Sequence, residues 1–221
     1  MTTPLRIDFV SDVACPWCVI GLRSLQTALH ALEGEVAAEL HLQPFELNPN
    51  MAPEGENTFE HVQKKYGSTP ERSAAARNAL KQSGEALGFE FRHSPDSRIW
   101  NTFDAHRLLH WAGLEGRQVE LKQALFKANF TDNLPLNDAE VLANAAAAAG
   151  LDADRARQIL ASDQFADVVR QEEELWRSRG IQAVPSIVIE NRWLIQGGQA
   201  PEVFEAALRK IAAELSTAPT P

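Results

Sequence analysis

Hydrophobic and polar positions divide the chain into stretches with different periodicities. An apolar run from Leu5 to Val10 is typical of a buried strand. Apolar residues then recur at helical spacing between Cys15 and Leu32, and Gly34 suits the end of a helix. A second strand is predicted from Val36 to Phe45. The first stretch therefore predicts a β-α-β unit.

The central stretch, residues 56–179, shows helical periodicity and little sign of strands. Thr69-Pro70-Glu71 combines an N-cap residue, a proline at the first helical position and an acidic first turn. The pattern predicts helices over about 70–87, 102–113, 115–130, 138–149, 152–160 and 165–179.

The C-terminal stretch returns to strand periodicity before a last helix. Ser186–Glu190 and Trp193–Gln196 are predicted to form a β-hairpin, which Gly197-Gly198 ends. Residues 201–215 read as an amphipathic helix. The order βαβ, a block of helices, then αββα predicts an α/β fold with a large helical insertion. We expect residues 1–50 and 165–221 to form the sheet domain and residues 51–164 the insertion.

Composition narrows the classes of function. The 221 residues are 44% hydrophobic and 23% charged, with a formal net charge of −9, which argues against nucleic acid or anionic membrane as the main partner. No apolar run approaches the ~20 residues of a membrane span, and no secretory signal is visible. We therefore expect a cytoplasmic protein.

The candidate chemistry lies in the chain's two cysteines, Cys15 and Cys18, at the start of the first predicted helix. Backbone N–H groups and the helix dipole favour a thiolate at Cys15. Because structural disulfides are rare in the cytoplasm, the pair is expected to be catalytic or metal-binding. A zinc site needs more ligands, and His106 and His110 lie far along the chain in no finger-like spacing. We predict no metal site.

Each residue of the Cys-Pro-Trp-Cys motif has an expected role. Cys15, the more exposed sulfur, attacks a substrate disulfide, and Cys18, one turn into the helix, resolves the mixed disulfide. Pro16 fits the first helical turn because it has no N–H to lose there. Trp17 either offers substrates an apolar platform or packs against the insertion.

Five segments, in this order, resemble the DsbA family and, within it, the cytosolic FrnE-like branch. They are Ser11–Cys18, Pro44–Pro49, Asn101–Arg107, Gly180–Ser186 and Gly197–Gln199. The resemblance implies a thioredoxin-like fold with a large all-helical insertion between the βαβ and αββα halves.

The same resemblance implies further site residues. It places a cis proline, Pro185, opposite the cysteines, with the backbone of Val184 facing the substrate. An acid on the first strand often accepts protons in such enzymes; Asp8 is the candidate, and Asp12 either shares that role or stabilises its loop. Pro-Trp replaces the Pro-His of periplasmic DsbA enzymes, so we expect Cys15 to be less acidic than in a strong oxidant.

Other residues could line a groove beside the motif or could simply pack in the core and loops. These are Phe45, Leu47, Asn48 and the segment 101–107, and Arg107 could bind an anion such as a glutathione carboxylate or remain in solvent.

The resemblance implies a cytoplasmic thiol–disulfide oxidoreductase, a reductase or isomerase of protein disulfides. It would need no bound cofactor beyond the Cys15–Cys18 disulfide, and glutathione could serve as reductant. Partners would be a protein or a small thiol or disulfide, with neither nucleic acid nor membrane, and the insertion could mediate a homodimer. Two alternatives stay open: a glutathione-dependent isomerase or transferase of the 2-hydroxychromene-2-carboxylate isomerase or kappa class, and a chaperone-like binding module.

Overall fold

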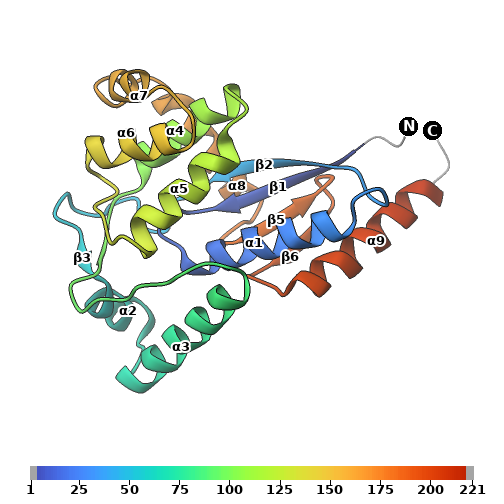
Figure 1. The fold of residues 1–221 in the computed structure, drawn as a ribbon, viewed down its shortest axis with the longest axis horizontal. Coiled ribbons are helices and arrows are strands. Elements are labelled where there is room, and N and C mark those ends of the chain that lie inside the picture. The colour runs from blue at the N-terminus through green and yellow to red at the C-terminus, as the bar shows by residue number, and fades with distance from the viewer. Residues whose placement is uncertain (1–3, 218–221) are drawn as a thin grey trace.

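A four-stranded sheet forms the centre of the computed structural model, which describes residues 4–217 (Figure 1). Its strands are β1 (Leu5–Ser11), β2 (Ala38–Pro44), β5 (Ser186–Ile189) and β6 (Trp193–Gln196), in the order β2-β1-β5-β6. β1 pairs with β2 in parallel, and the pairs β1–β5 and β5–β6 are antiparallel. This arrangement joins the predicted βαβ unit to the predicted hairpin.

Helices cover both faces of the sheet. On one face lie α1 (Pro16–Ala31) and α9 (Pro201–Thr217), in front of the sheet in Figure 1, and Ile7 and Phe9 of β1 are buried with them. α8 (Ala166–Ser178) covers the other face, where its Trp176 packs near Val10. Successive residues of β1 therefore point to opposite faces, as strand geometry requires.

The insertion carries most of the remaining helices. α2 (Thr58–Tyr66) and α3 (Pro70–Ala86) lie near the N-terminal end of α1, at the lower left of Figure 1. α4 (Phe103–Leu114), α5 (Gln118–Phe130), α6 (Ala139–Ala148) and α7 (Ala153–Leu160) build a second core, which also takes in Val13. This core holds the loop that precedes the cysteines against the insertion.

The fold confirms the predicted class and the predicted order of elements, whose ends differ by a few residues. The sequence pattern did not predict two features. One is α2, which buries none of its residues; the other is a ladder between β3 (Glu56–Asn57) and β4 (Arg98–Ile99). Two-residue strands are too short to show a period, so the expectation of an insertion without strands was wrong.

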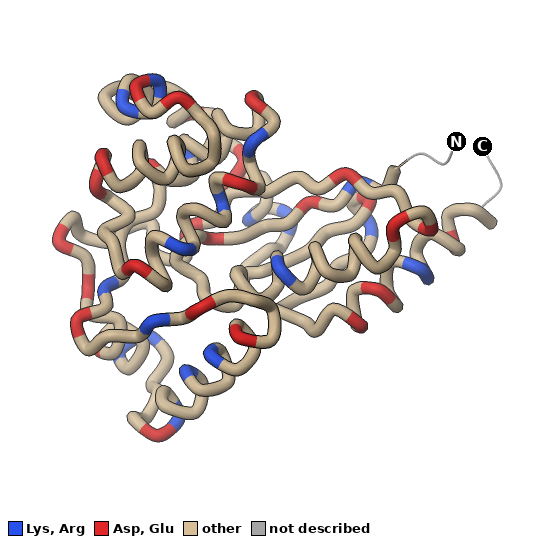
Figure 2. The backbone as a smooth tube through the Cα atoms, in the orientation of Figure 1, with Lys and Arg blue, Asp and Glu red and all other residues tan. Residues whose placement is uncertain are grey.

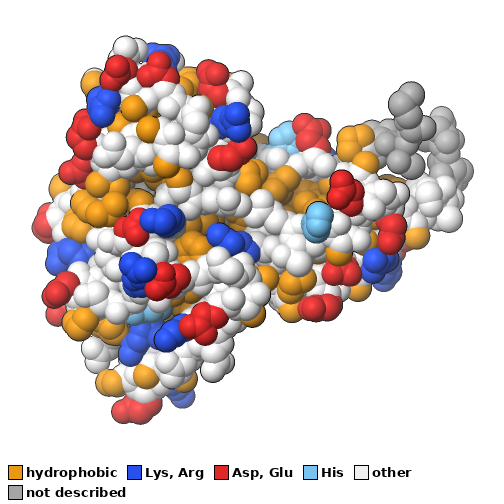
Figure 3. All heavy atoms as spheres, viewed as in Figure 1, with side chains coloured by type: hydrophobic (Ala, Val, Ile, Leu, Met, Phe, Trp, Pro, Cys, Tyr) orange, Lys and Arg blue, Asp and Glu red, His pale blue; other side chains and the backbone are white. Residues whose placement is uncertain are grey.

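Charged residues spread over the whole molecule. Acidic positions occur along most elements in Figure 2, and acidic and basic side chains are mixed over the face drawn in Figure 3. Of the helices within residues 4–217, none combines the length and the apolar character that a membrane span requires.

Candidate active site

The two cysteines lie at the N-terminal end of α1. Cys15 is its N-cap residue and Pro16 its first helical residue, and no side chain caps the helix. The N–H of Cys18 donates to the Cys15 carbonyl at 3.1 Å, which places the second sulfur one turn into the helix. Cys18 is fully buried, whereas Cys15 is 4% exposed and lines a large groove. Trp17, 39% exposed, lies on the rim of that groove.

The loop before β5 lies against the first sulfur. The Cys15 thiol donates to the Val184 carbonyl at 3.5 Å, and the Val184–Pro185 peptide bond is cis. Glycines permit this close approach: a Cβ at Gly21 would lie 3.0 Å from Pro185 Cγ, and one at Gly198 would lie 2.8 Å from the Trp17 carbonyl oxygen. The sequence segments 180–186 and 197–199 thus meet the cysteine motif in space.

Asp12 anchors the loop beneath the cysteines. Its Oδ2 accepts from the Leu47 N–H at 2.7 Å and its Oδ1 from the Ala14 N–H at 3.1 Å, while His106 Nε2 lies 3.5 Å from Oδ1. Burial alone would raise the pKa of Asp12, but the His106 ring and the two backbone N–H groups outweigh it, so the pKa is lowered. Asp12 is therefore a buried carboxylate that holds the loop, one of the two roles expected for it.

The expectation that Asp8 accepts protons from the cysteines is wrong. Asp8 alternates with Phe9 along β1, so its side chain points to the α8 face while Cys18 packs with Phe9 on the α1 face. Its carboxylate is also satisfied already, by Arg6 at 2.8 Å and by Gln43 Nε2 at 2.6 Å.

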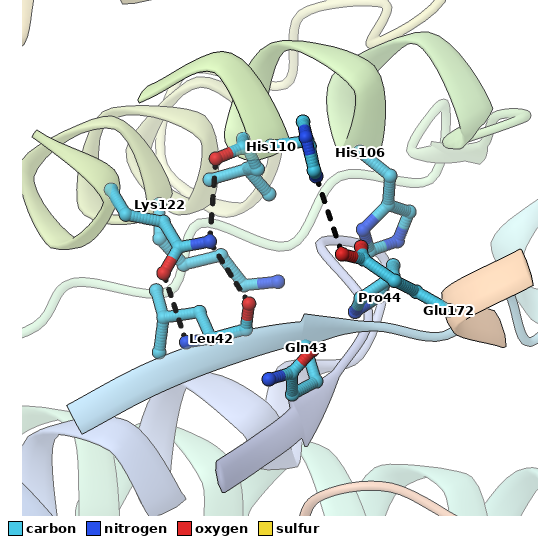
Figure 4. A pocket seen from close by; sticks show the side chains of 9 residues that line it. Leu42, Gln43, Pro44, His106, His110, Lys122 and Glu172 are labelled. Atoms are coloured by element: carbon cyan, nitrogen blue, oxygen red, sulfur yellow. Dashed lines mark hydrogen bonds and ion pairs between the residues drawn. The ribbon is translucent and has the colours of Figure 1, made fainter. Parts of the chain in front are cut away.

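A lysine from the insertion supplies a buried charge instead. Lys122 of α5 is 1% exposed and extends into a cavity of about 10 Å³ beside β2, with His106, His110 and Glu172 on its other sides (Figure 4). Its ammonium lies 5.3 Å from the centre of the Phe126 ring and makes no hydrogen bond or ion pair within residues 4–217. Burial lowers the pKa of Lys122 to about 8, against the attraction of Cys18, Asp12 and Cys15.

The buried thiol responds to the same neighbours. Burial raises the pKa of Cys18 well above its ordinary value, and the adjacent Cys15 raises it further, while Lys122 acts in the opposite direction. Cys18 therefore rests as a neutral thiol, and Lys122 is the nearby cation that favours its deprotonation.

A groove of about 1040 Å³ opens in front of Cys15. Its apolar lining comes from the motif, from the loop after β2, from α2 and α3, and from the segments around β4 and the end of α5: Trp17, Phe45, Leu47, Phe59, Val62, Tyr66, Leu80, Trp100 and Phe130. Of the two roles considered for Phe45, Leu47 and Asn48, the structure shows groove lining. A groove of this size and lining can hold a ligand with a large apolar surface.

Segment 101–107 does not line the groove, which leaves core and loop packing, the other role considered for it. Arg107 is 4% exposed, so it does not remain in solvent, and its guanidinium pairs with the Asp104 carboxylate at 2.7 Å. Its guanidinium donates to the Ile159 carbonyl at 2.6 Å and to the Gln164 carbonyl at 2.9 Å, so it ties α4 to the end of α7 and the loop after it.

The two histidines of α4 do not form a joint site. His106 faces Asp12, and His110 Nδ1 lies 3.4 Å from Glu172 Oε1 (Figure 4). Within residues 4–217, no three His, Cys, Asp or Glu side chains are placed to hold a metal ion together.

Several residues of the site carry no local signal in the sequence. Tyr66 ends α2, and the charge of Cys15, after burial, raises the pKa of its phenol, so the two groups are electrostatic neighbours. Asn129 of α5 donates to the Val13 carbonyl at 3.1 Å and lines the groove. Both come from the insertion, so only the tertiary structure brings them to the cysteines.

The chain matches known proteins over almost its whole length. A family model described as DSBA-like thioredoxin domain covers residues 6–209. A probable DsbA oxidoreductase from Streptomyces coelicolor is 34% identical, with a TM-score of 0.90, over 98% of this chain and 93% of the other.

The chain is also similar to one more distant relative in sequence and to another protein in fold. The uncharacterized protein YwbO of Bacillus subtilis is 25% identical over 92% of this chain and 96% of its own. A 2-hydroxychromene-2-carboxylate isomerase, at 13% identity and a TM-score of 0.66, covers 97% of this chain and 100% of its own, and shares the fold. Because the family model covers residues 6–209 and the Streptomyces coelicolor structure is 34% identical over 98% of the chain, the chain belongs to the DSBA-like thioredoxin domain family of thiol–disulfide oxidoreductases.

Proposed function

We propose that this protein reduces or isomerises disulfides in polypeptides by dithiol exchange through Cys15 and Cys18. One observation carries the proposal. The Cys15 sulfur reaches the groove beside the Val184 carbonyl, at 3.5 Å, while the Cys18 sulfur is buried one turn behind it. An accessible sulfur backed by a buried one is the arrangement that attack followed by resolution requires.

In the reducing direction the exchange proceeds in two steps. The Cys15 thiolate attacks one sulfur of the substrate disulfide, forms a mixed disulfide and releases the other sulfur as a thiolate that takes a proton. The Cys18 thiolate then attacks the Cys15 sulfur, which releases the second substrate thiol and leaves the Cys15–Cys18 disulfide. Two electrons pass from the enzyme to the substrate, and an external thiol such as glutathione would restore the reduced enzyme.

Two groups would assist these steps. Cys18 must lose a proton before it attacks, and Lys122, its buried cationic neighbour, would stabilise the thiolate. Val184 makes no hydrogen bond through its N–H within residues 4–217, so its backbone is available to pair with an extended substrate segment. Trp17 and Pro16 would contact the same segment from the rim of the groove.

We propose that this protein acts in the cytoplasm, where the reducing thiol pool favours reduction or isomerisation over net oxidation. The glutathione-dependent isomerase remains the second candidate because a protein of that activity shares the fold. That activity should survive loss of Cys18, whereas dithiol exchange with turnover should not.

Reduction of insulin with dithiothreitol tests the proposal. We expect wild-type protein to accelerate insulin reduction, and Cys15→Ser and Cys18→Ser to lose turnover, because each lacks one sulfur of the exchange. The proposal is wrong if wild-type protein is inactive or if all three proteins are equally active. Glutathione-dependent isomerisation that persists in Cys18→Ser would then favour the second candidate.

A further inference from the structure

One wall of the groove carries cations that the carboxylates lining the groove do not neutralise. Lys65 of α2, Arg77 of α3 and Arg98 of β4 all line the groove. Lys65 donates to the Leu47 carbonyl and to Asn48 Oδ1, at 2.8 and 2.6 Å, and Arg98 donates to the carbonyls of Glu54 and Gly55. None of the three forms an ion pair with a carboxylate inside residues 4–217. We call these three residues the cationic wall.

The other charged groups of the groove are largely compensated. Arg92 pairs with Glu90 at 2.8 Å, Arg177 lies 3.9 Å from Glu173, and Glu46 pairs with Arg170. His61 pairs with Glu56. Burial and the charge of Arg77 lower the pKa of His93, which keeps its ring neutral at pH 7. Asp96 is the one lining acid without a partner there, so the groove keeps a positive balance.

The excess of positive charge is confined to the groove. The whole chain has a net charge of −9, and acidic and basic side chains are mixed on the face in Figure 3. In Figure 2, Lys and Arg positions are frequent along α2, α3 and the segment after α3. A positive groove in an acidic protein attracts anions and repels cations, so it selects ligands by charge.

The cationic wall is interleaved with an uncovered apolar face. Phe59, Val62 and Tyr66 fall on one side of α2 and line the groove, although α2 has no buried residue. The Arg77 guanidinium lies 4.5 Å from the centre of the Phe59 ring. A ligand that covers this wall must therefore offer apolar groups and carboxylates together, along a groove that Cys15 also lines.

We infer that the preferred substrates are disulfide-bonded polypeptide segments with acidic and apolar residues close to the cysteine. The inference rests on the proposed function and deepens it. The substrate cysteine meets Cys15, its backbone lies along Val184, and its flanking carboxylates face Lys65, Arg77 and Arg98. Exposed charge pairs are individually weak, so two of them together give a preference of about fivefold to tenfold over a neutral segment.

The test uses peptides that share one apolar sequence and one cysteine, joined by a disulfide to a chromogenic thiol, and differ in flanking Glu, Gln or Lys. The full-length protein should release the chromogenic thiol fastest from the acidic peptide and slowest from the basic one, and salt should shrink the difference. Lys65→Gln/Arg77→Gln should lose the preference. The matched control, Lys64→Gln/Lys81→Gln, changes the same charge on the same two helices outside the groove and should keep it.

Binding is measured separately from chemistry, by fluorescence anisotropy of labelled peptides without cysteine on the Cys15→Ser protein. If no peptide is reduced, the proposed function fails and the substrate inference falls with it, even if the acidic peptide binds best and the cationic wall therefore selects acidic segments. If all three peptides react and bind equally, disulfide exchange stands and the inference is overturned. The inference is also overturned if Lys65→Gln/Arg77→Gln slows the reduction of oxidised glutathione but not that of the peptides, because the cationic wall then serves a small anionic disulfide.

Discussion

At the scale of single residues, the chemistry depends on opposite charges buried beneath the cysteines. Asp12 is held as a carboxylate by His106 and two backbone N–H groups, and Lys122 is the cation that faces it and Cys18. The Lys122 ammonium has the Phe126 ring 5.3 Å away but no ion pair within residues 4–217, and such a buried lysine destabilises the fold because the ammonium loses its hydration. Its presence beside Cys18 is consistent with a role in the exchange rather than in stability.

Lys122→Met should reveal how much the buried lysine destabilises the fold. The pKa of Lys122 is about 8 in the folded protein against 10.5 for a free lysine, so between these values the unfolded chain binds more protons and the lysine's contribution to stability rises with pH. The variant should be more stable than wild type at pH 7, by on the order of 3 kcal/mol, and this advantage should shrink from pH 8 to 10.5.

Urea unfolding across this pH range measures the difference between the two proteins, in which the titration of groups that Lys122 does not influence cancels. Lys127→Met is the control, since Lys127 lies on the same helix with its side chain 63% exposed. A difference between wild type and Lys122→Met that does not change with pH would contradict the assignment.

At the scale of elements, α2 differs from the other helices of the insertion. It buries no residue, and its N-cap Asn57 accepts from the Phe59 N–H at 2.9 Å and the Glu60 N–H at 3.3 Å. The Asn57 amide also donates to the Pro95 carbonyl at 2.7 Å. Because little packing holds α2, its order depends on this cap more than on a core.

Asn57→Ala should therefore loosen α2 alone. Loss of an N-cap costs about 1 kcal/mol, so amide hydrogen exchange in residues 58–66 should quicken about fivefold while the global unfolding midpoint stays unchanged. Asp152→Ala removes the same kind of cap from α7, whose Ala156 and Ile159 are buried, and should lower the global midpoint instead. Equal exchange of α2 in Asn57→Ala and wild type would show that its packing suffices.

The elements also show which features the sequence could predict. Long periodic segments such as 16–31 and 201–217 were recognisable because their apolar faces are buried in one core. The alternation of side chains along β1 also predicts that Asp8 faces away from the cysteines, since Asp8 lies between Ile7 and Phe9, both of which face α1. Lys122 and Tyr66 could not be linked to Cys15 from sequence, because only the packing of the insertion brings them there.

At the scale of the whole molecule, the sheet and the insertion interlock at the active site. Phe126 of α5, 2% exposed, belongs to the core between the sheet and α1, while Val13, just before the cysteines, belongs to the core of α4–α7. Each half thus completes the core of the other. The division at residues 50 and 164 stays a prediction about sequence segments, and we expect the segments to unfold together.

Phe126→Ala tests this cooperation. Removal of a fully buried phenylalanine costs about 3–5 kcal/mol, and the loss should shift a single transition when far-ultraviolet circular dichroism and tryptophan fluorescence follow the same denaturation. Leu114→Ala, at a side chain on α4 that is 68% exposed, should change stability by no more than about 0.5 kcal/mol. Two separate transitions in Phe126→Ala would show that the halves unfold independently.

The most direct test of the central claim is capture of the mixed disulfide. Cys18→Ser, mixed with a disulfide-bonded peptide, should form a covalent adduct that intact-mass spectrometry detects at the mass of protein plus one peptide thiol, and peptide mapping should place it on Cys15. Cys15→Ser should form none, because Cys18 is fully buried and its pKa is raised. An adduct on Cys18, or no adduct with either variant, would contradict the assignment of Cys15 as nucleophile and Cys18 as resolving thiol.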